Sequence, residues 1–102
     1  KERYSLLEAV ERVWDNHYSM GEKQNIPLLL GSLLYESAFY TRAADFFRIS
    51  IDTFGKECNV LYNMALSCYY AGETKEARSC LSDLLDINPS YPPALKFLKG
   101  FY

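Results

Sequence analysis

The stretch NMALSCYYAGETKEARSCLSDLLDINP (residues 63–89) decides the fold that this sequence predicts. Within it, Ala65, Ala77 and Pro89 follow one another at intervals of twelve residues, and the residues between them are compatible with helix. A small residue on each of two antiparallel helices lets the backbones approach toward about 8 Å, the short end of the usual range. Proline ends the second helix because it cannot donate the next backbone hydrogen bond. The stretch therefore predicts a tightly packed helix hairpin.

The helical pattern extends through most of the chain. Apolar residues recur at helical spacing, and no segment alternates as a strand would. The breaks between helices are short runs of glycine, asparagine and proline, so successive helices must be antiparallel. We also expect the hydroxyl of Thr74 to cap the fifth helix. The sequence predicts six helices, at residues 3–19, 26–38, 40–54, 58–71, 74–87 and 92–101.

The chain matches itself at an offset of about 34 residues, a period known for helix-hairpin repeats. Leu30-Gly31 falls on Met64-Ala65, and Ala43 falls on Ala77. The match continues backward, where Ala9 precedes Ala43, and forward into the last helix. Further matched pairs are Leu34 with Cys68, Tyr35 with Tyr69, Val13 with Phe47, Phe47 with Leu81, Ile51 with Leu85, Leu61 with Leu95 and Met64 with Leu98.

These residues have the spacing of the tetratricopeptide repeat pattern, W-x2-L-G-x2-Y, then A-x3-F, then P, and the chain resembles that family. Residues 58–91 contain Leu61-x2-Met64-Ala65-x2-Cys68, Ala77-x3-Leu81 and Pro89, and residues 24–57 contain the corresponding set from Pro27 to Gly55. The sequence departs from the pattern at Pro27 and Leu61, where the family favours Trp, at Cys68, where it favours Tyr, and at Gly55, where it favours Pro. Pro27 is expected to delay the start of its helix.

The resemblance implies an all-α fold, a right-handed superhelical stack of antiparallel helix hairpins. Residues 1–20 would be the second helix of a partial repeat, 24–57 and 58–91 two full repeats, and 92–102 a capping helix. The last helix is expected to be a cap because Lys99 stands where the small Gly31 and Ala65 stand in the repeats, and its bulk keeps a partner helix away.

The charge balance argues against nucleic acid and membrane partners. Eleven basic and thirteen acidic residues give a net charge of −2, so nothing draws the chain to phosphate backbones or anionic lipid. No apolar run reaches the roughly 18 residues of a membrane span. RNA-binding helical repeats have a similar period, but a basic stripe is missing here.

The cysteines point to a reducing compartment, which we expect to be the cytoplasm. Cys58, Cys68 and Cys80 are an odd number without zinc-type spacing. Antiparallel pairing of Ala65 with Ala77 sets Cys68 opposite about residue 74 and Cys80 opposite about residue 62. We therefore expect no disulfide between Cys68 and Cys80, and a core position for Cys68.

No residue pattern indicates catalysis, a metal or a cofactor. His17 is the single histidine, and it has no carboxylate, cysteine or serine partner at a useful spacing. No paired carboxylates, glycine-rich phosphate loop or nucleophile motif is present. We expect a protein that is not an enzyme, with His17 at the surface or at a helix end.

In tetratricopeptide arrays the first helix of each repeat lines a concave groove that holds a peptide or a partner helix. The resemblance implies a partner-binding site at Leu28, Ser32, Tyr35, Asn59, Tyr62, Asn63, Leu66, Tyr69 and Tyr70, with Asn25, Leu29 and Glu36 on the same face. This face is rich in tyrosine and poor in charge, a composition associated with binding hot spots. An alternative is that Tyr35, Leu66 and Tyr69 only pack against neighbouring helices.

Family members that bind the C-terminal carboxylate of chaperones use Lys, Asn and Arg side chains in this groove. The matching positions here are Leu28, Ser32, Asn63, Pro93 and Phe97, so this type of ligand is not expected. The leading prediction is a non-enzymatic scaffold or adaptor that binds a segment of another protein through its tyrosines.

The alternative prediction is a structural role, either as a segment of a longer tetratricopeptide scaffold or as a self-associating subunit. It rests on the expectation that the first helix exposes its apolar face, with Leu6, Leu7, Val10 and Trp14.

Overall fold

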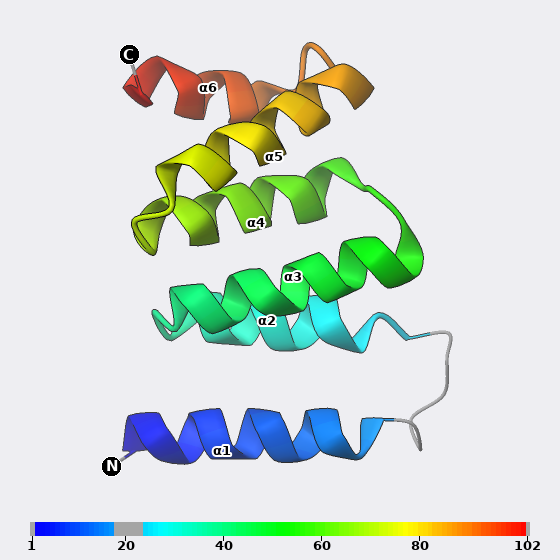
Figure 1. Cartoon of the computed structure of the whole chain (residues 1–102), viewed down its shortest axis with the longest axis vertical. Coiled ribbons are helices and arrows are strands. Elements are labelled where there is room, and N and C mark those ends of the chain that lie inside the picture. Colours follow the sequence, from blue (N-terminus) through cyan, green and yellow to red (C-terminus); the bar gives the residue numbers. More distant parts are fainter. Residues whose placement is uncertain (1, 18–23, 102) are drawn as a thin grey trace.

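The computed structural model describes residues 2–17 and 24–101 and shows an all-α domain (Figure 1). Six helices and no strand are present in these residues. The helices are α1 (Glu2–Asp15), α2 (Ile26–Glu36), α3 (Tyr40–Phe54), α4 (Cys58–Tyr70), α5 (Thr74–Ile87) and α6 (Pro92–Phe101). The predicted bounds are confirmed to the residue for α3, α5 and α6, and within two residues for α2 and α4.

Helix α1 is shorter than predicted: it ends at Asp15, whereas the predicted helix extends to residue 19. The side-chain amide of Asn16 donates a hydrogen bond to the Arg12 carbonyl at 2.8 Å, four residues back. A side chain that bonds the backbone in this way competes with the next helical hydrogen bond. The helix therefore ends at Asp15, and residues 18 and 19 of the prediction lie outside the described part of the chain.

Helix α2 begins where Asn25 and Pro27 favour a start. The Asn25 side chain accepts a hydrogen bond from the Leu28 amide at 3.1 Å, which satisfies an otherwise unpaired amide of the first turn. Pro27 lies in that turn, where its missing N–H costs nothing. The predicted delay of this helix after Gly21 agrees with the observed start at Ile26.

The α2–α3 and α4–α5 turns have the same geometry. The Phe39 amide donates to the Leu34 carbonyl at 2.8 Å, and the Glu73 amide donates to the Cys68 carbonyl at 2.8 Å. Each turn contains one residue at positive φ, Ala38 at 66° and Gly72 at 88°. This is the Schellman motif, which satisfies the last carbonyls of a helix. It explains why α2 ends before residue 38.

The expected Thr74 cap is wrong. Glu73 is the N-cap residue of α5, it makes no side-chain capping bond, and Thr74 is the first helical residue. The reason lies in the preceding turn, because the Glu73 amide closes the Schellman motif of α4 and α5 starts directly after it.

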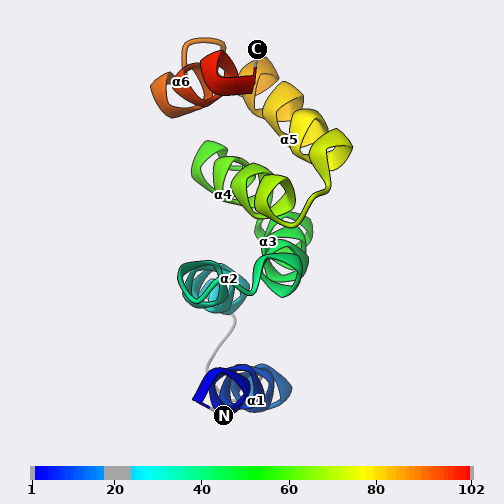
Figure 2. The same ribbon diagram turned by 90° about the vertical axis from the view of Figure 1, so that its left-hand side faces the viewer.

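The helices pack in chain order, each antiparallel to the next within the hairpins α2–α3 and α4–α5. Seen along the helices, α2, α4 and α6 lie on one side of the stack, and α3 and α5 lie on the other (Figure 2). The stack measures 40 × 32 × 19 Å. Its radius of gyration, 14.0 Å, slightly exceeds the about 13 Å of an average domain of this length.

Small residues are buried in both helix hairpins. Ala65 and Ala77 are both fully buried between α4 and α5. In the α2–α3 hairpin, a Cβ atom added to Gly31 would lie only 2.8 Å from the buried ring of Phe47. This contact supports the argument that side-chain size sets the approach of the paired helices.

Candidate functional site

Seven aromatic rings form a continuous surface along the α2, α4 and α6 side of the stack. We call this set the aromatic surface, and it consists of Tyr35, Tyr40, Tyr62, Tyr69, Tyr70, Tyr91 and Phe97. Consecutive ring centroids lie between 5.2 and 6.4 Å apart, within the range of favourable aromatic contacts.

Three tyrosines from different helices meet at one end of the aromatic surface. The Tyr40 ring at the start of α3 lies 5.5 Å from Tyr35 of α2 and 5.2 Å from Tyr70 of α4. Tyr35 and Tyr70 are 6.4 Å apart. This triad ties the C-terminal ends of α2 and α4 to the turn between α2 and α3.

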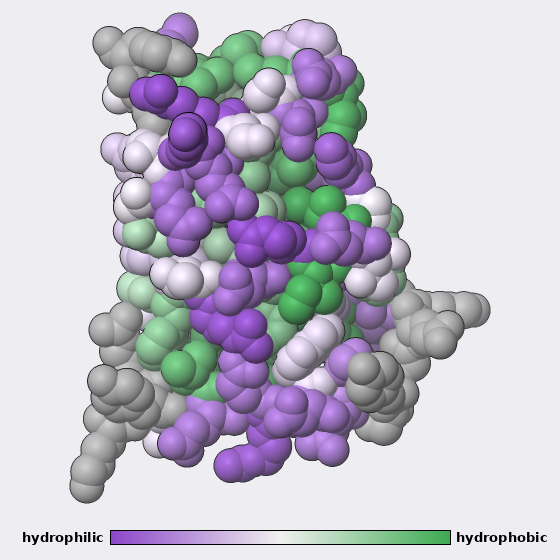
Figure 3. Space-filling view, viewed as in Figure 1, coloured by the Kyte–Doolittle hydropathy of each residue, from purple (hydrophilic) through white to green (hydrophobic). Residues whose placement is uncertain are grey.

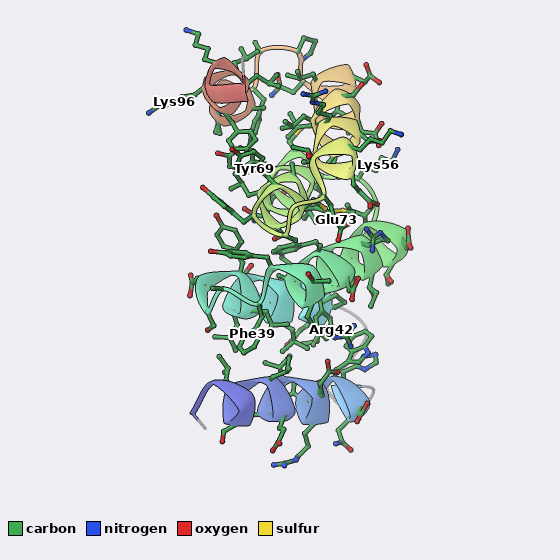
Figure 4. The ribbon with its side chains drawn as sticks, turned by 60° about the vertical axis from the view of Figure 1, so that its left-hand side comes forward. Phe39, Arg42, Lys56, Tyr69, Glu73 and Lys96 are labelled. Atoms are coloured by element: carbon green, nitrogen blue, oxygen red, sulfur yellow. The ribbon has the colours of Figure 1, made fainter. Side chains whose placement is uncertain are left out.

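The surface continues from α4 to α6 through Tyr69 and Phe97. The Tyr69 ring lies 5.3 Å from Tyr70 and 5.2 Å from Phe97, to which it is perpendicular. Tyr62, two helical turns before Tyr69, contacts Phe97 at 6.4 Å and Tyr91 at 6.1 Å. Tyr69 therefore lies between the two ends of the surface, as Figure 4 shows for its position between α4 and α6.

The aromatic surface is partly open to solvent. Tyr70 is 53% exposed and Tyr69 is 39% exposed, whereas the other five residues are half-buried. The half-buried rings pack against neighbouring helices, so the alternative that these residues serve packing holds in part for Tyr35. Tyr69 and Tyr70 also present area that no other described residue covers.

Burial raises the pKa of the two half-buried tyrosines Tyr35 and Tyr62. For Tyr35 the largest cause is desolvation, followed by the neighbouring hydroxyls of Tyr70, Tyr40 and Tyr62. For Tyr62 the cause is again desolvation, followed by Tyr91 and Tyr70. At neutral pH both hydroxyls are protonated, as in any tyrosine, and can donate hydrogen bonds.

An open pocket lies where α6 begins. Its volume is about 580 Å³, and it is lined by Tyr62 of α4 and by Pro92, Pro93, Lys96 and Phe97 of α6. A volume of this size falls within the ordinary range of ligand pockets. The pocket is continuous with the aromatic surface through Tyr62 and Phe97.

The opposite side of the stack carries paired charges instead of aromatic rings. Arg42 of α3 holds Glu11 of α1 through two hydrogen bonds, of 2.5 and 2.9 Å. Arg48 bonds Glu76 of α5 at 2.9 Å, and Asp45 lies between the two arginines, within 3.5 Å of each. Figure 3 looks onto this side and shows hydrophilic residues along the middle of the stack.

The bond to Arg42 is the main cause of a lowered pKa for Glu11, and the same bond raises the pKa of Arg42. The charges of these two arginines are therefore compensated within the molecule.

None of the nine predicted site residues is buried. Asn59, Tyr69 and Tyr70 are exposed, and Leu28, Ser32, Tyr35, Tyr62, Asn63 and Leu66 are half-buried. The Ser32 hydroxyl already donates to the Leu28 carbonyl at 2.8 Å. The structure brings Tyr35, Tyr62, Tyr69 and Tyr70 into one surface.

Sequence reasoning did not include Tyr40, Tyr91, Lys96 or Phe97 in the site. Tyr40 and Tyr91 lie at a helix start and in a loop, where helical periodicity gives no signal. Lys96 and Phe97 lie in the predicted cap. The only available signal was the high aromatic content of the chain, 16%.

The predicted separation of Cys68 from Cys80 is wrong. Both side chains are buried between α4 and α5, and a hydrogen bond between the two thiols is the main cause of the raised pKa of Cys68. Two small buried residues, one turn apart, lie on each of these helices: Ala65 and Cys68 on α4, and Ala77 and Cys80 on α5. The contact between the two thiols does not fit the register that follows from pairing Ala65 directly with Ala77. All three cysteines are free thiols, as expected.

The expected exposure of the apolar face of α1 is also wrong. Val10 is buried, and Leu6, Leu7 and Trp14 pack half-buried against the core. The Trp14 ring lies 5.3 Å from the Phe46 ring, so this face is turned into the stack. Among the residues of α1 from Ser5 onward, whose burial is described, the exposed apolar ones are Ala9 and Val13.

The structure gives no support for a metal site within residues 2–17 and 24–101. No group of three or more His, Cys, Asp and Glu side chains is placed to hold a metal there. His17 is half-buried at the end of α1, where its ring stacks on Trp14 at 3.9 Å and its Nδ1 contacts the Trp14 carbonyl. None of the described helices has the length and apolar character needed to cross a membrane.

No family model, no curated protein and no solved structure matches the chain.

Proposed function

We propose that this protein is a non-enzymatic interaction module of the tetratricopeptide type, which binds a segment of a partner protein at the aromatic surface. The observation that carries the proposal is the contrast between the two sides of the stack. On the α3 and α5 side, Arg42 and Arg48 are paired with carboxylates of neighbouring helices, whereas the α2, α4 and α6 side presents aromatic rings with exposed area. Exposed aromatic residues are typical of binding hot spots.

The repeat assignment is supported by burial that recurs at the same 34-residue offset. The first such position lies near the start of α2, α4 and α6 and is buried in all three, as Ile26, Val60 and Ala94. The matched pairs Gly31 with Ala65 and Ala43 with Ala77 are also buried. Matched positions in α2 and α4 therefore have matched environments, as a stack of repeated hairpins requires.

The pattern breaks in α6 in the way that a terminal element would break it. Leu95 matches the buried Pro27 and Leu61, yet it is 41% exposed, and Lys99 is exposed where Gly31 and Ala65 are buried. In α2 and α4 these positions face the second helix of the hairpin. No described helix covers them in α6, which supports the proposal that α6 is a cap.

The same surface argues against other ligands. It offers no basic stripe for nucleic acid, and its matched positions lack the cations that hold a chaperone carboxylate. Stacking on the aromatic rings favours an apolar or aromatic segment of a protein.

The proposal predicts that Tyr69→Ala/Tyr70→Ala loses a partner that the wild-type chain captures from native lysate, by at least about tenfold. Both side chains are exposed, so we expect the free energy of unfolding to change by less than about 2 kcal/mol. Quantitative mass spectrometry of the captured proteins and thermal denaturation give the two readouts.

The matched control is Phe54→Ala/Ile87→Ala, which removes two exposed apolar side chains from the ends of α3 and α5. This control should retain the captured partner. Equal loss in both double variants, or a large fall in the stability of the tyrosine variant alone, would count against the proposal.

A second candidate is self-association through the ends of the stack. Ala9 and Val13 of α1 match Ala43 and Phe47 of α3, but they are exposed, and Leu95 is exposed at the other end. The α1 of one copy would then pack on the α6 of the next, in the manner of α3 on α2. Lys99 opposes this contact, because it fills the place of a small residue. Sedimentation over a range of concentrations decides, since a species that stays monomeric excludes this candidate.

A further inference from the structure

The pocket at the start of α6 has apolar walls and a single charged group. Tyr62, Pro92, Pro93 and Phe97 supply the walls, and Lys96 supplies the charge. The two prolines have no backbone N–H, so their part of the pocket offers no donor to a ligand. Tyr62 and Phe97 meet edge to face, at an interplanar angle of 89°. An apolar side chain that enters the pocket would therefore contact rings and prolyl carbons.

The charged residues of α6 are both positive. Helix α6 holds two of the eleven basic residues and none of the thirteen acidic residues. Arg42, Arg48 and Lys56 are each paired with a carboxylate, whereas no ion pair is found for the exposed Lys96 among the described residues. Figure 4 shows Lys96 extending from α6 on the side of the stack where Tyr69 lies.

We propose that this pocket binds a protein segment in which an apolar side chain is next to, or one residue away from, an aspartate or glutamate. The proposal rests on the proposed function and names the chemistry of the partner. The apolar side chain enters the pocket against Tyr62, Phe97 and the two prolines, and the carboxylate accepts a hydrogen bond from the Lys96 ammonium. A basic segment at the same place would be repelled by Lys96.

A partner protein is favoured over other anions by the charge of the rest of the chain. A polyanion such as nucleic acid or an anionic membrane needs several cations, and it would meet the net negative charge of the molecule. One carboxylate beside one apolar side chain needs only the groups that line this pocket.

The experiment uses three pools of short blocked, fluorescein-labelled peptides. Each pool fixes one central residue as Asp, Asn or Lys, and the flanking positions are drawn from Leu, Phe, Pro, Ser and Gly. Fluorescence anisotropy measures the binding of each pool to the wild-type chain, to Lys96→Glu and to Lys99→Glu. Lys99 lies one turn beyond Lys96 on α6 and does not line the pocket, so Lys99→Glu controls for the general change in charge.

We expect the wild-type chain to bind the Asp pool about three- to tenfold more tightly than the Lys pool, with the Asn pool between them. Lys96→Glu should reverse this order, and Lys99→Glu should retain it. Both lysines are exposed, so circular dichroism should show that both variants remain folded.

Equal binding of the three pools, a preference for the Lys pool, or an Asp preference that survives Lys96→Glu would overturn the proposed carboxylate contact and leave the proposed function standing. Absence of binding by every pool would instead count against the aromatic surface as a binding site, and so against both.

Discussion

Single positions in the two hairpin turns show how one residue sets the backbone. Ala38 and Gly72 occupy the same place in two Schellman motifs, and both have positive φ. Glycine adopts this conformation without steric cost, whereas a Cβ atom clashes with the backbone at a cost of about 1 to 2 kcal/mol. The α2–α3 turn therefore carries strain that the α4–α5 turn does not.

Ala38→Gly and Gly72→Ala should change the free energy of unfolding in opposite directions. We expect Ala38→Gly to raise the free energy of unfolding by about 0.5 to 1 kcal/mol, because the relief of strain exceeds the entropy that glycine adds to the unfolded chain. Gly72→Ala should lower it by about 1 kcal/mol. A Cβ atom at Gly72 would have no neighbour within 4 Å, so the loss would come from the backbone alone. Urea denaturation measures both, and changes of the same sign would refute this explanation.

At the scale of the helix pair, the two hairpins use different combinations of side chains to reach the same packing. The α2–α3 hairpin places a glycine, Gly31, against the large ring of Phe47. The matched positions in α4 and α5 hold Ala65 and Leu81, both buried. A larger side chain on one helix is thus matched by a smaller one on the other, which keeps the interface filled and free of overlap.

The effects of substitutions at Gly31 and Phe47 on stability should therefore be coupled. Gly31→Ala in the wild-type chain pushes a methyl group into the Phe47 ring, and this overpacking, about 1 to 3 kcal/mol, should exceed the about 1 kcal/mol gained from helix propensity. In a Phe47→Leu background the same change copies the Ala65 and Leu81 pair, and it should become stabilising.

A double-mutant cycle by denaturation gives a coupling free energy that we expect to be at least about 1 kcal/mol. Gly100→Ala is the control, because Gly100 is helical but a Cβ atom there would contact nothing within 4 Å. Strictly additive effects of Gly31→Ala and Phe47→Leu would contradict the coupling.

The positions of the helices could be predicted from sequence because glycine, proline and asparagine mark most of the breaks. Where a break depends on a less common device, the prediction ran too far. Asn16 ends α1 through a side-chain bond to the Arg12 carbonyl, and Ala38 ends α2 in a left-handed conformation that alanine rarely adopts.

The candidate site could also be predicted only in part from the sequence. The tyrosines Tyr35, Tyr62 and Tyr69 could be selected because they fall at the positions that line the groove in the tetratricopeptide repeats that the sequence resembles. Tyr40 and Tyr91 could not, because they join the aromatic surface through contacts between helices that are distant in sequence. The thiol contact of Cys68 with Cys80 was missed for a related reason, since it depends on the register of α4 against α5.

At the scale of the whole molecule, the stack separates two kinds of surface. On the α3 and α5 side, ion pairs join α1 to α3 and α3 to α5, and these charges need no external partner. On the α2, α4 and α6 side, aromatic rings join the helices and leave area exposed at Tyr69 and Tyr70. Ion pairs on such an exposed face contribute little stability, so the packing of the core holds the stack together.

The most direct test of partner binding at the aromatic surface is amide chemical-shift mapping. The isotope-labelled chain is titrated with the partner segment that the wild-type protein captures. We expect chemical-shift changes to concentrate in α2, α4 and the first turns of α6, around Tyr35, Tyr69 and Phe97, while the amide shifts around Arg42 and Arg48 remain unchanged. Shift changes centred on the ion-paired α3 and α5 side, with the aromatic surface unaffected, would contradict partner binding at that surface.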